Sequence, residues 1–155
     1  MARVFIETTI PSSLYETRTD RRSRDWRSQT ELWWRRHRSG YTLVTSDFVV
    51  AEFLRAPGSK SAHASIFFDE MTVLEQPVRL QETISFYIQN RLMPSDASGD
   101  AAHLAMASLH GVDFILTWNC RHLANANKAR HMRAINERLG LQSPIICTPF
   151  ELIPE

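Results

Sequence analysis

The sequence lacks the features that mark membrane-spanning and disulfide-stapled proteins. No segment approaches the run of about 18 apolar residues that a membrane-spanning helix needs, and no basic start leads into an apolar export signal. Only two cysteines are present, Cys120 and Cys147, and they lie far apart in the chain. This spacing, without an export signal, favours reduced thiols over a disulfide. We therefore expect a soluble, cytoplasmic protein with no membrane partner.

Glycine and proline are also sparse, with 5 Gly and 7 Pro in 155 residues, and no stretch of them is long enough to link two domains. Hydrophobic residues make up 43% of the chain, enough to form a core without metal or disulfide staples. We therefore expect a single domain that spans residues 1–155.

Short apolar runs alternate with longer stretches of helical periodicity. The predicted strands are 3–6, 42–45, 72–74, 114–117 and 145–147. The predicted helices are 20–38, 46–55, 61–71, 77–92, 98–109 and 121–139. Such alternation is typical of α/β proteins, because a helix connects each pair of parallel strands. We expect a three-layer α/β/α sandwich around a central, mainly parallel five-stranded sheet.

The net charge is only +1, but the charges are unevenly distributed along the chain. Residues 18–38 contain eight arginines against three acids, whereas residues 65–100 contain six acids against two arginines. Basic walls beside an acidic centre would suit a metal-dependent protein that acts on nucleic acid, with Arg21, Arg22 and Arg24 as phosphate contacts. The alternative is that these arginines are merely solvated surface.

Polar residues follow two predicted strands at the point where each strand ends. Glu7 and Thr8 come directly after the first strand, and Thr117 and Asn119 stand at the exit of the fourth. Ligand sites of open parallel sheets lie outside the carboxyl ends of the strands. The four residues are therefore candidates for one site, although the hydroxyls could simply cap backbone groups.

Two further acids stand on predicted helices. Glu52 lies in a helix so apolar that its carboxylate must be paired, protonated or bound to a ligand. Asp100 opens a helix, and His103 follows one turn later on the same face, where we expect it to support the site by a hydrogen bond. Taken singly, Glu52 could pair with an arginine, and Asp100 could favour the positive end of its helix. We expect Glu7, Glu52 and Asp100 to converge in one surface depression.

A cluster of oxygen ligands favours Mg²⁺ or Mn²⁺ over zinc or copper. Such ions lower the pKa of water and stabilise the attacking and leaving oxygens of a phosphodiester. Other chemistries have less support, because the sequence contains no phosphate-binding loop and no nucleophile elbow. Cys120 and His122 form too short a motif for a zinc site, and Asp47 and Asp96 are assigned to helix starts.

Four motifs occur in the order typical of the PIN-domain family. They are Val-Phe-Ile-Glu7-Thr-Thr-Ile-Pro-Ser, Val-Val-Ala-Glu52-Phe, Gly-Asp100-Ala-Ala-His-Leu-Ala and Ile-Leu-Thr117-Trp-Asn119-Cys-Arg-His-Leu. With the closing segment 145–152, the sequence resembles the VapC-like branch of that family over essentially the whole chain. The resemblance implies a PIN fold, a magnesium- or manganese-dependent ribonuclease, a toxin restrained by a cognate antitoxin, and a homodimer. It also implies that the catalytic and metal-binding residues are Glu7, Glu52, Asp100 and Asn119.

The sequence departs from the commonest pattern of the family at two positions, with Glu7 and Asn119 where aspartate is usual or frequent. Both residues retain an oxygen ligand, but Glu7 is longer and Asn119 is uncharged. One alternative is therefore a catalytically weak PIN module that binds RNA or an antitoxin without cleaving. A more distant one is a metal-dependent phosphatase, against which the missing Asp-x-Asp motif counts.

Overall fold

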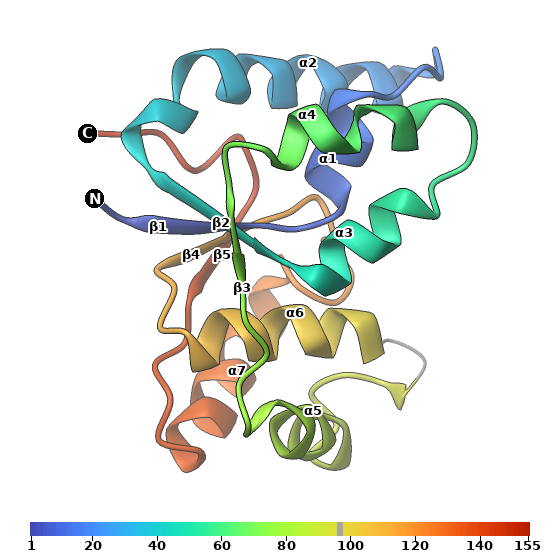
Figure 1. Cartoon of the computed structure of the whole chain (residues 1–155). Coiled ribbons are helices and arrows are strands. Elements are labelled where there is room, and N and C mark those ends of the chain that lie inside the picture. The colour runs from blue at the N-terminus through green and yellow to red at the C-terminus, as the bar shows by residue number, and fades with distance from the viewer. Residues whose placement is uncertain (96–97) are drawn as a thin grey trace.

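The computed structural model describes residues 1–95 and 98–155 of the chain (Figure 1), so Asp96 lies outside the described residues. Its centre is one five-stranded sheet in the order β3-β2-β1-β4-β5, and every pair of neighbouring strands is parallel. The strands are β1 (Arg3–Ile6), β2 (Thr42–Ser46), β3 (Thr72–Leu74), β4 (Phe114–Leu116) and β5 (Ile145–Cys147). The predicted α/β class and five-stranded sheet are confirmed, and the sheet is entirely parallel.

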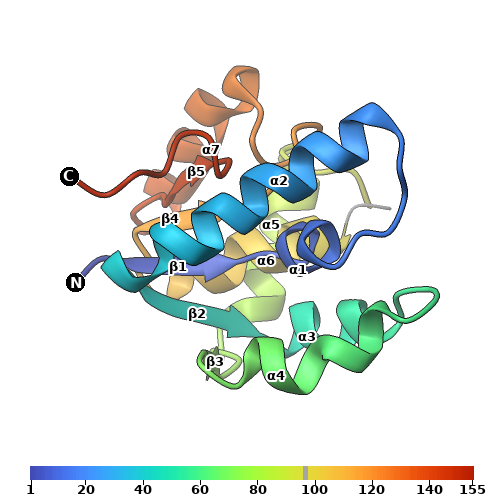
Figure 2. The ribbon, with the colours of Figure 1, turned by 90° about the horizontal axis from the view of Figure 1, so that it is seen from above.

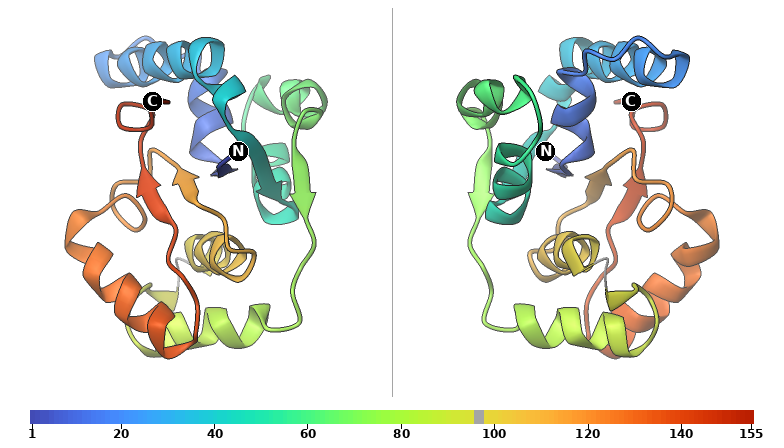
Figure 3. Two further views of the ribbon diagram at one scale, coloured as in Figure 1. Left: turned by 90° about the vertical axis from the view of Figure 1, so that its left-hand side faces the viewer. Right: turned by 90° about the vertical axis from the view of Figure 1, so that its right-hand side faces the viewer.

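Helices cover both faces of this sheet (Figure 1, Figure 3). The α-helices of the described residues are α1 (Thr9–Leu14), α2 (Arg21–Arg36), α3 (Asp47–Leu54), α4 (Ala64–Phe68), α5 (Leu80–Gln89), α6 (Ser98–Leu109) and α7 (Ala126–Arg138). Two 3₁₀ turns, η1 (Arg38–Gly40) and η2 (Lys60–His63), follow α2 and precede α4. Helices α1, α2 and α4 lie on one side, and α5, α6 and α7 lie on the other (Figure 1). No helix in the described part of the chain is long and apolar enough to cross a membrane.

Each buried strand supplies both cores, because successive side chains of a strand point to opposite faces. Val4 and Ile6 pack into a cluster with Ile10, Trp33 and Phe67, which covers the face below α1, α2 and α4. Phe5, between them, packs into the cluster formed by α5, α6 and α7. The sheet is therefore buried on both faces, as its continuous apolar strands predict.

The carboxyl ends of β1 and β2 point toward one side of the molecule (Figure 1). Helix α2 crosses the sheet, and its first turn lies on that same side (Figure 2). The side chain of Asp20 caps this turn by accepting a hydrogen bond from the Ser23 N–H at 3.2 Å. The fold thus brings the arginine-rich start of α2 to the edge where the strands end.

The structure differs from the sequence-based prediction at three connections. Helix α1 was not predicted, the predicted helix 61–71 is a 3₁₀ turn followed by the short α4, and α7 begins at Ala126 instead of residue 121. In the last case, Asn119 and Asn125 accept backbone hydrogen bonds from His122 and Asn127, and these turns delay the helix. Gly140 follows α7 with a φ of 72°, as expected for a helix stop.

Candidate active site

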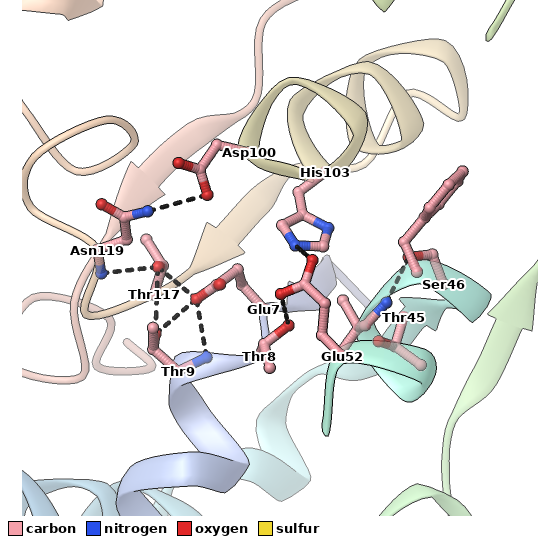
Figure 4. Close-up of polar contacts among 12 residues, drawn as sticks. Glu7, Thr8, Thr9, Thr45, Ser46, Glu52, Asp100, His103, Thr117 and Asn119 are labelled. Carbon is pink, nitrogen blue, oxygen red and sulfur yellow. Dashed lines mark hydrogen bonds and ion pairs between the residues drawn. The ribbon is translucent and has the colours of Figure 1, made fainter. Parts of the chain in front are cut away.

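Glu7 leaves the carboxyl end of β1 and is 3% exposed. Its backbone N–H donates to the Leu116 carbonyl at 3.2 Å, which ties the residue to β4. Its carboxylate atom Oε2 accepts three hydrogen bonds, from Thr9 N at 3.0 Å, Thr9 Oγ1 at 2.5 Å and Thr117 Oγ1 at 2.7 Å (Figure 4). All three donors are uncharged, so they orient the carboxylate without neutralising it.

Glu52 reaches the same place from α3, a helix capped by Ser46 Oγ, which accepts from Val49 N at 3.3 Å. Its Oε1 accepts from His103 Nε2 at 2.9 Å, and its Oε2 accepts from Thr8 Oγ1 at 3.0 Å (Figure 4). Burial acts to raise the pKa of the Glu52 carboxyl, but the hydrogen bond and charge of His103 and the bond from Thr8 outweigh it, and the pKa is lowered. Glu52 is therefore held in its charged form.

His103 is 1% exposed, and its ring centroid lies 6.0 Å from that of Phe5. Its Nδ1 is buried and has no hydrogen-bond partner among the described residues. Burial acts to lower the pKa of His103, but the hydrogen bond to Glu52 and the charges of the surrounding carboxylates outweigh it, so the pKa is raised. The hydrogen bond of His103 was expected beside Asp100, one turn away on the same helix, but in the structure it is made to Glu52 on α3.

Asp100 lies in the first turn of α6 and meets Asn119, which follows β4. Its Oδ1 accepts from Asn119 Nδ2 at 3.0 Å, while Asn119 Oδ1 accepts from the backbone N–H of His122 at 3.1 Å (Figure 4). Only the amide oxygen of Asn119 can accept the hydrogen bond from the His122 N–H. The amide nitrogen must therefore be the atom that faces Asp100. Asn119 thus presents its donor, not its oxygen, to the carboxylate.

These side chains meet at one edge of the sheet. Ligand atoms of Glu7, Glu52 and His103 all lie within 4.8 Å of one another and could hold a metal ion. Asp100 stands beside them, and its charge contributes to the raised pKa of His103. The side chains of Thr8 and Thr117 also contact the acids, through the bonds to Glu52 and Glu7.

Sequence reasoning missed two residues of this cluster. Thr9 makes two of the three hydrogen bonds to Glu7, but nothing in the sequence distinguishes it from the neighbouring Thr8. Gly99 passes so close to Glu52 that a Cβ at this position would lie 3.1 Å from Oε1. Its place directly before Asp100, in a helix that glycine would otherwise weaken, was the available signal.

The candidate phosphate contacts Arg21, Arg22 and Arg24 all lie exposed in the first turn of α2. Arg21 Nε is 3.9 Å from Asp25 Oδ2, and the Arg22 guanidinium lies 4.2 Å from the centre of the Trp26 ring. The first turn of α2, which carries these arginines, is on the side of the molecule to which β1 points (Figure 2). They therefore share a side with the acidic cluster but belong to a separate element.

No protein-family model matches the chain, and no curated sequence matches it significantly. Several solved structures do. A chain of a toxin–antitoxin complex from Klebsiella pneumoniae is 14% identical, with 96% of this chain and 99% of that chain covered and a TM-score of 0.60. VapBC2 from Rickettsia felis, bound to a DNA fragment from its promoter, is 13% identical, with 94% and 98% covered and a TM-score of 0.55.

Mycobacterium tuberculosis VapC20, a toxin that cleaves the sarcin–ricin loop, is 17% identical, with 72% of this chain and 86% of that chain covered and a TM-score of 0.53. At these identities the similarity concerns the fold. The order of the sequence motifs predicted the same fold independently of these structures. The chain therefore has the VapC-like PIN fold.

Proposed function

We propose that this chain is a divalent-metal-dependent endoribonuclease, a VapC-like toxin that an antitoxin restrains. The observation that carries the proposal is the meeting of Glu7, Glu52 and His103, whose ligand atoms lie within 4.8 Å of one another, with Asp100 beside them at the strand-end edge (Figure 4). A buried carboxylate without a cation is costly unless a ligand provides one. The cleavage of the sarcin–ricin loop by VapC20, which has the same fold, supports RNA as the substrate class.

The donor set fits a hard divalent cation such as Mg²⁺ or Mn²⁺. Glu7, Glu52 and Asp100 offer carboxylate oxygens, the ligands that these ions prefer. The oxygen of Asn119 has a second lone pair beside the one that accepts from His122, so it remains a proposed ligand. When bound, the ion supplies positive charge that makes water a stronger acid and offsets the charge of the phosphodiester.

The remaining residues of the cluster position these carboxylates. Thr9 and Thr117 hold Glu7 by three hydrogen bonds, and His103 and Thr8 fix the two oxygens of Glu52. Residues that orient ligands in this way typically change metal affinity or activity by about 10- to 100-fold when they are replaced. We therefore assign Thr8, Thr117 and His103 to supporting roles.

The direct test is cleavage of a circular RNA by the purified chain. We expect Mn²⁺ to support cleavage, excess chelator to abolish it, and Asp100→Ala to remove it in the presence of Mn²⁺. A circular substrate has no ends, so any product proves internal cleavage. Cleavage that persists in chelator, or that Asp100→Ala leaves intact, would refute the metal-dependent mechanism.

We further propose that Arg21, Arg22 and Arg24 bind RNA phosphates, since clustered arginines provide sequence-independent attraction. Replacing all three with glutamate should weaken RNA binding and reduce the slope of affinity against salt concentration. Binding measured by fluorescence anisotropy at several salt concentrations would test this. A slope that does not change would remove the start of α2 from the RNA-binding surface.

We also propose an antitoxin partner and a homodimer, because the solved structures with a similar fold include toxin–antitoxin complexes.

The alternative function is a catalytically weak module that binds RNA or an antitoxin without cleaving. The observation that favours it is Asn119, which places a neutral amide against Asp100 at a position where the family often has an acid. RNA binding without any cleavage in Mn²⁺ would support this alternative.

A further inference from the structure

Two tryptophans from distant parts of the chain form a stacked pair near the candidate site. The rings of Trp26 on α2 and Trp118 after β4 are 4.9 Å apart with an interplanar angle of 10°. Arg22 lies over the Trp26 ring at 4.2 Å, and Phe150 meets Trp118 edge-on at 5.5 Å. Phe150 is 55% exposed, and Arg22 makes no salt bridge within residues 1–95 and 98–155. Trp118 is buried and Trp26 is half-buried, so the surface here consists of Arg22, Phe150 and the accessible part of Trp26.

Hydrogen bonds tie this pair directly to the candidate metal site. The backbone N–H of Trp118 donates to Thr9 Oγ1 at 2.8 Å, and the same hydroxyl donates to Glu7 Oε2 at 2.5 Å. The indole N–H of Trp118 donates to Thr30 Oγ1 at 2.9 Å, which fixes the ring against α2. The stack is therefore a rigid platform one residue away from the Glu7 cluster.

Two surface hollows meet at this platform. The first has a volume of about 430 Å³ and extends from Thr9 to Trp26, and its charged lining residues are Glu16, Arg18, Asp20 and Arg22. The second has a volume of about 390 Å³ and lies between Trp26 and Phe150, with Arg21, Arg22 and Asp25 on its walls. Arg22 and Trp26 line both hollows, so the hollows adjoin at these two residues, and we refer to them together as the path.

We propose that this path binds single-stranded RNA, with phosphates at Arg21 and Arg22 and one unpaired base stacked on Trp26; the proposal rests on the nuclease function above. Stacking on aromatic rings beside a basic groove is how proteins hold single strands without reading their sequence. The exposed Arg22 guanidinium occupies the indole face, and a base can replace it there because both are flat and stack on aromatic rings. The bases of a duplex are already stacked on each other, so the platform selects unpaired RNA.

The test is the affinity of the full chain for a fluorescein-labelled, single-stranded RNA of mixed sequence, measured by anisotropy in chelator so that no cleavage occurs. We expect Trp26→Leu to weaken binding about tenfold, the effect of losing one stacked base. We expect Trp26→Phe, which keeps a flat ring, to restore most of the affinity. Binding of a duplex of the same length should be unaffected by either change.

Trp34→Leu is the matched control. Trp34 stands on the same helix and lies under Arg38 at 5.0 Å, but its ring stacks on Phe67, away from Trp118. A general loss of helix packing would reduce RNA affinity in both variants. The proposal requires that only Trp26→Leu reduces it, and equal losses in the two variants would overturn it.

A series of probes, each with one abasic position, then locates the stacked base. At one position, removal of the base should weaken binding to the parent chain. The same probe should bind Trp26→Leu no more weakly than the intact RNA does, because that variant has already lost the stacking contact. If no position behaves in this way, or if Trp26→Leu binds RNA as well as the parent, the proposal fails. A protein partner would then be the alternative occupant of the path. Base-dependent binding by a chain that never cleaves would instead refute only the nuclease function.

Discussion

Two buried glutamates in this molecule are held in opposite ways. Glu16, at the start of the loop after α1, is 8% exposed and pairs with two cations, Arg18 at 3.1 Å and Lys60 at 2.9 Å. Glu7 is 3% exposed, and within the described part of the chain its side chain receives hydrogen bonds only from Thr9 and Thr117, which are uncharged. The charge of Glu16 is balanced within the chain, whereas His103, the titratable base beside Glu7, donates its hydrogen bond to Glu52.

This difference separates a structural carboxylate from one available to a ligand. The Glu16 network joins the segment after α1 to η2 through Lys60, which also donates to Ser12 Oγ at 3.0 Å. Such a closed network stabilises the fold and has no capacity for another cation. The Glu7 carboxylate is oriented just as firmly, but among residues 1–95 and 98–155 no cationic side chain donates a hydrogen bond to it. Replacing each glutamate by the isosteric glutamine tests the comparison, because it removes the charge and keeps the shape.

The largest expected effect is on activity in Glu7→Gln. We expect RNA cleavage in Mn²⁺ to fall at least about 100-fold, since a bound ion contributes several kcal/mol and each 1.4 kcal/mol is tenfold in rate. The free energy of unfolding in chelator should fall less than in Glu16→Gln, because no cationic side chain loses its hydrogen-bond partner. Urea denaturation and a cleavage time course measure the two quantities. A large loss of stability would show that Glu7 has a structural role like that of Glu16.

Glu16→Gln should give the opposite pattern. We expect it to lower the free energy of unfolding by about 2 kcal/mol, the scale of hydrogen bonds to a charged group, while the affinity for Mn²⁺ stays unchanged. Calorimetric titration with Mn²⁺ and urea denaturation give both values. A changed Mn²⁺ affinity would mean that the Glu16 network is coupled to the Glu7 cluster.

The parent and Glu16→Gln should also differ in how their stability depends on pH. Burial acts to raise the pKa of Glu16, but hydrogen bonds from Arg18 and Lys60 and the charge of Lys60 outweigh it and lower the pKa from 4.5 to about 2. A group with a lowered pKa in the folded state stabilises the protein above its unfolded pKa, and this contribution disappears as the pH falls toward the folded value. The stability advantage of the parent over Glu16→Gln should therefore be complete above pH 4.5 and vanish near pH 2. Urea denaturation of both proteins across this range would show it, and a constant difference would contradict it.

The sequence predicted the sheet well because each strand is a short apolar run, although the edge strands β3 and β5 are partly exposed. The bounds of β1, β3 and β5 agree with the predicted runs, since continuous apolar stretches between turn residues leave little choice. Helix α1 was missed because six residues containing a proline and two serines show no clear helical period. It forms because Ile10 packs into the core with Trp33, a contact that only the folded chain provides.

The site was predictable in its acids and not in its hydrogen bonds. Glu7 and Asp100 follow rules of position, a strand end and a helix start, that can be read from the sequence. The pairing of His103 with Glu52 joins residues 51 positions apart on different helices, and the close approach of Gly99 to Glu52 joins residues 47 apart. Such contacts depend on how α3 and α6 pack, which local patterns do not encode.

The smallest expected effect concerns Asn119, whose amide donates to Asp100 and accepts from His122. In Asn119→Asp, one carboxylate oxygen can keep the hydrogen bond from the His122 N–H. The other oxygen then takes the place of Nδ2, which in the parent lies 3.0 Å from Asp100 Oδ1. Two unit charges about 4 Å apart repel by about 4 kcal/mol at an effective dielectric constant of 20, and protonation of one carboxylate would relieve part of this repulsion.

A divalent cation would relieve that repulsion, so we expect Asn119→Asp to bind Mn²⁺ about tenfold more tightly than the parent. Asn119→Ala should lose less affinity than Asp100→Ala, because it removes a neutral group and leaves the carboxylate. Calorimetric titration of the three variants ranks them, and urea denaturation in chelator should find Asn119→Asp less stable than the parent. If its Mn²⁺ affinity equals that of the parent, Asn119 acts only by positioning Asp100 and is not a ligand.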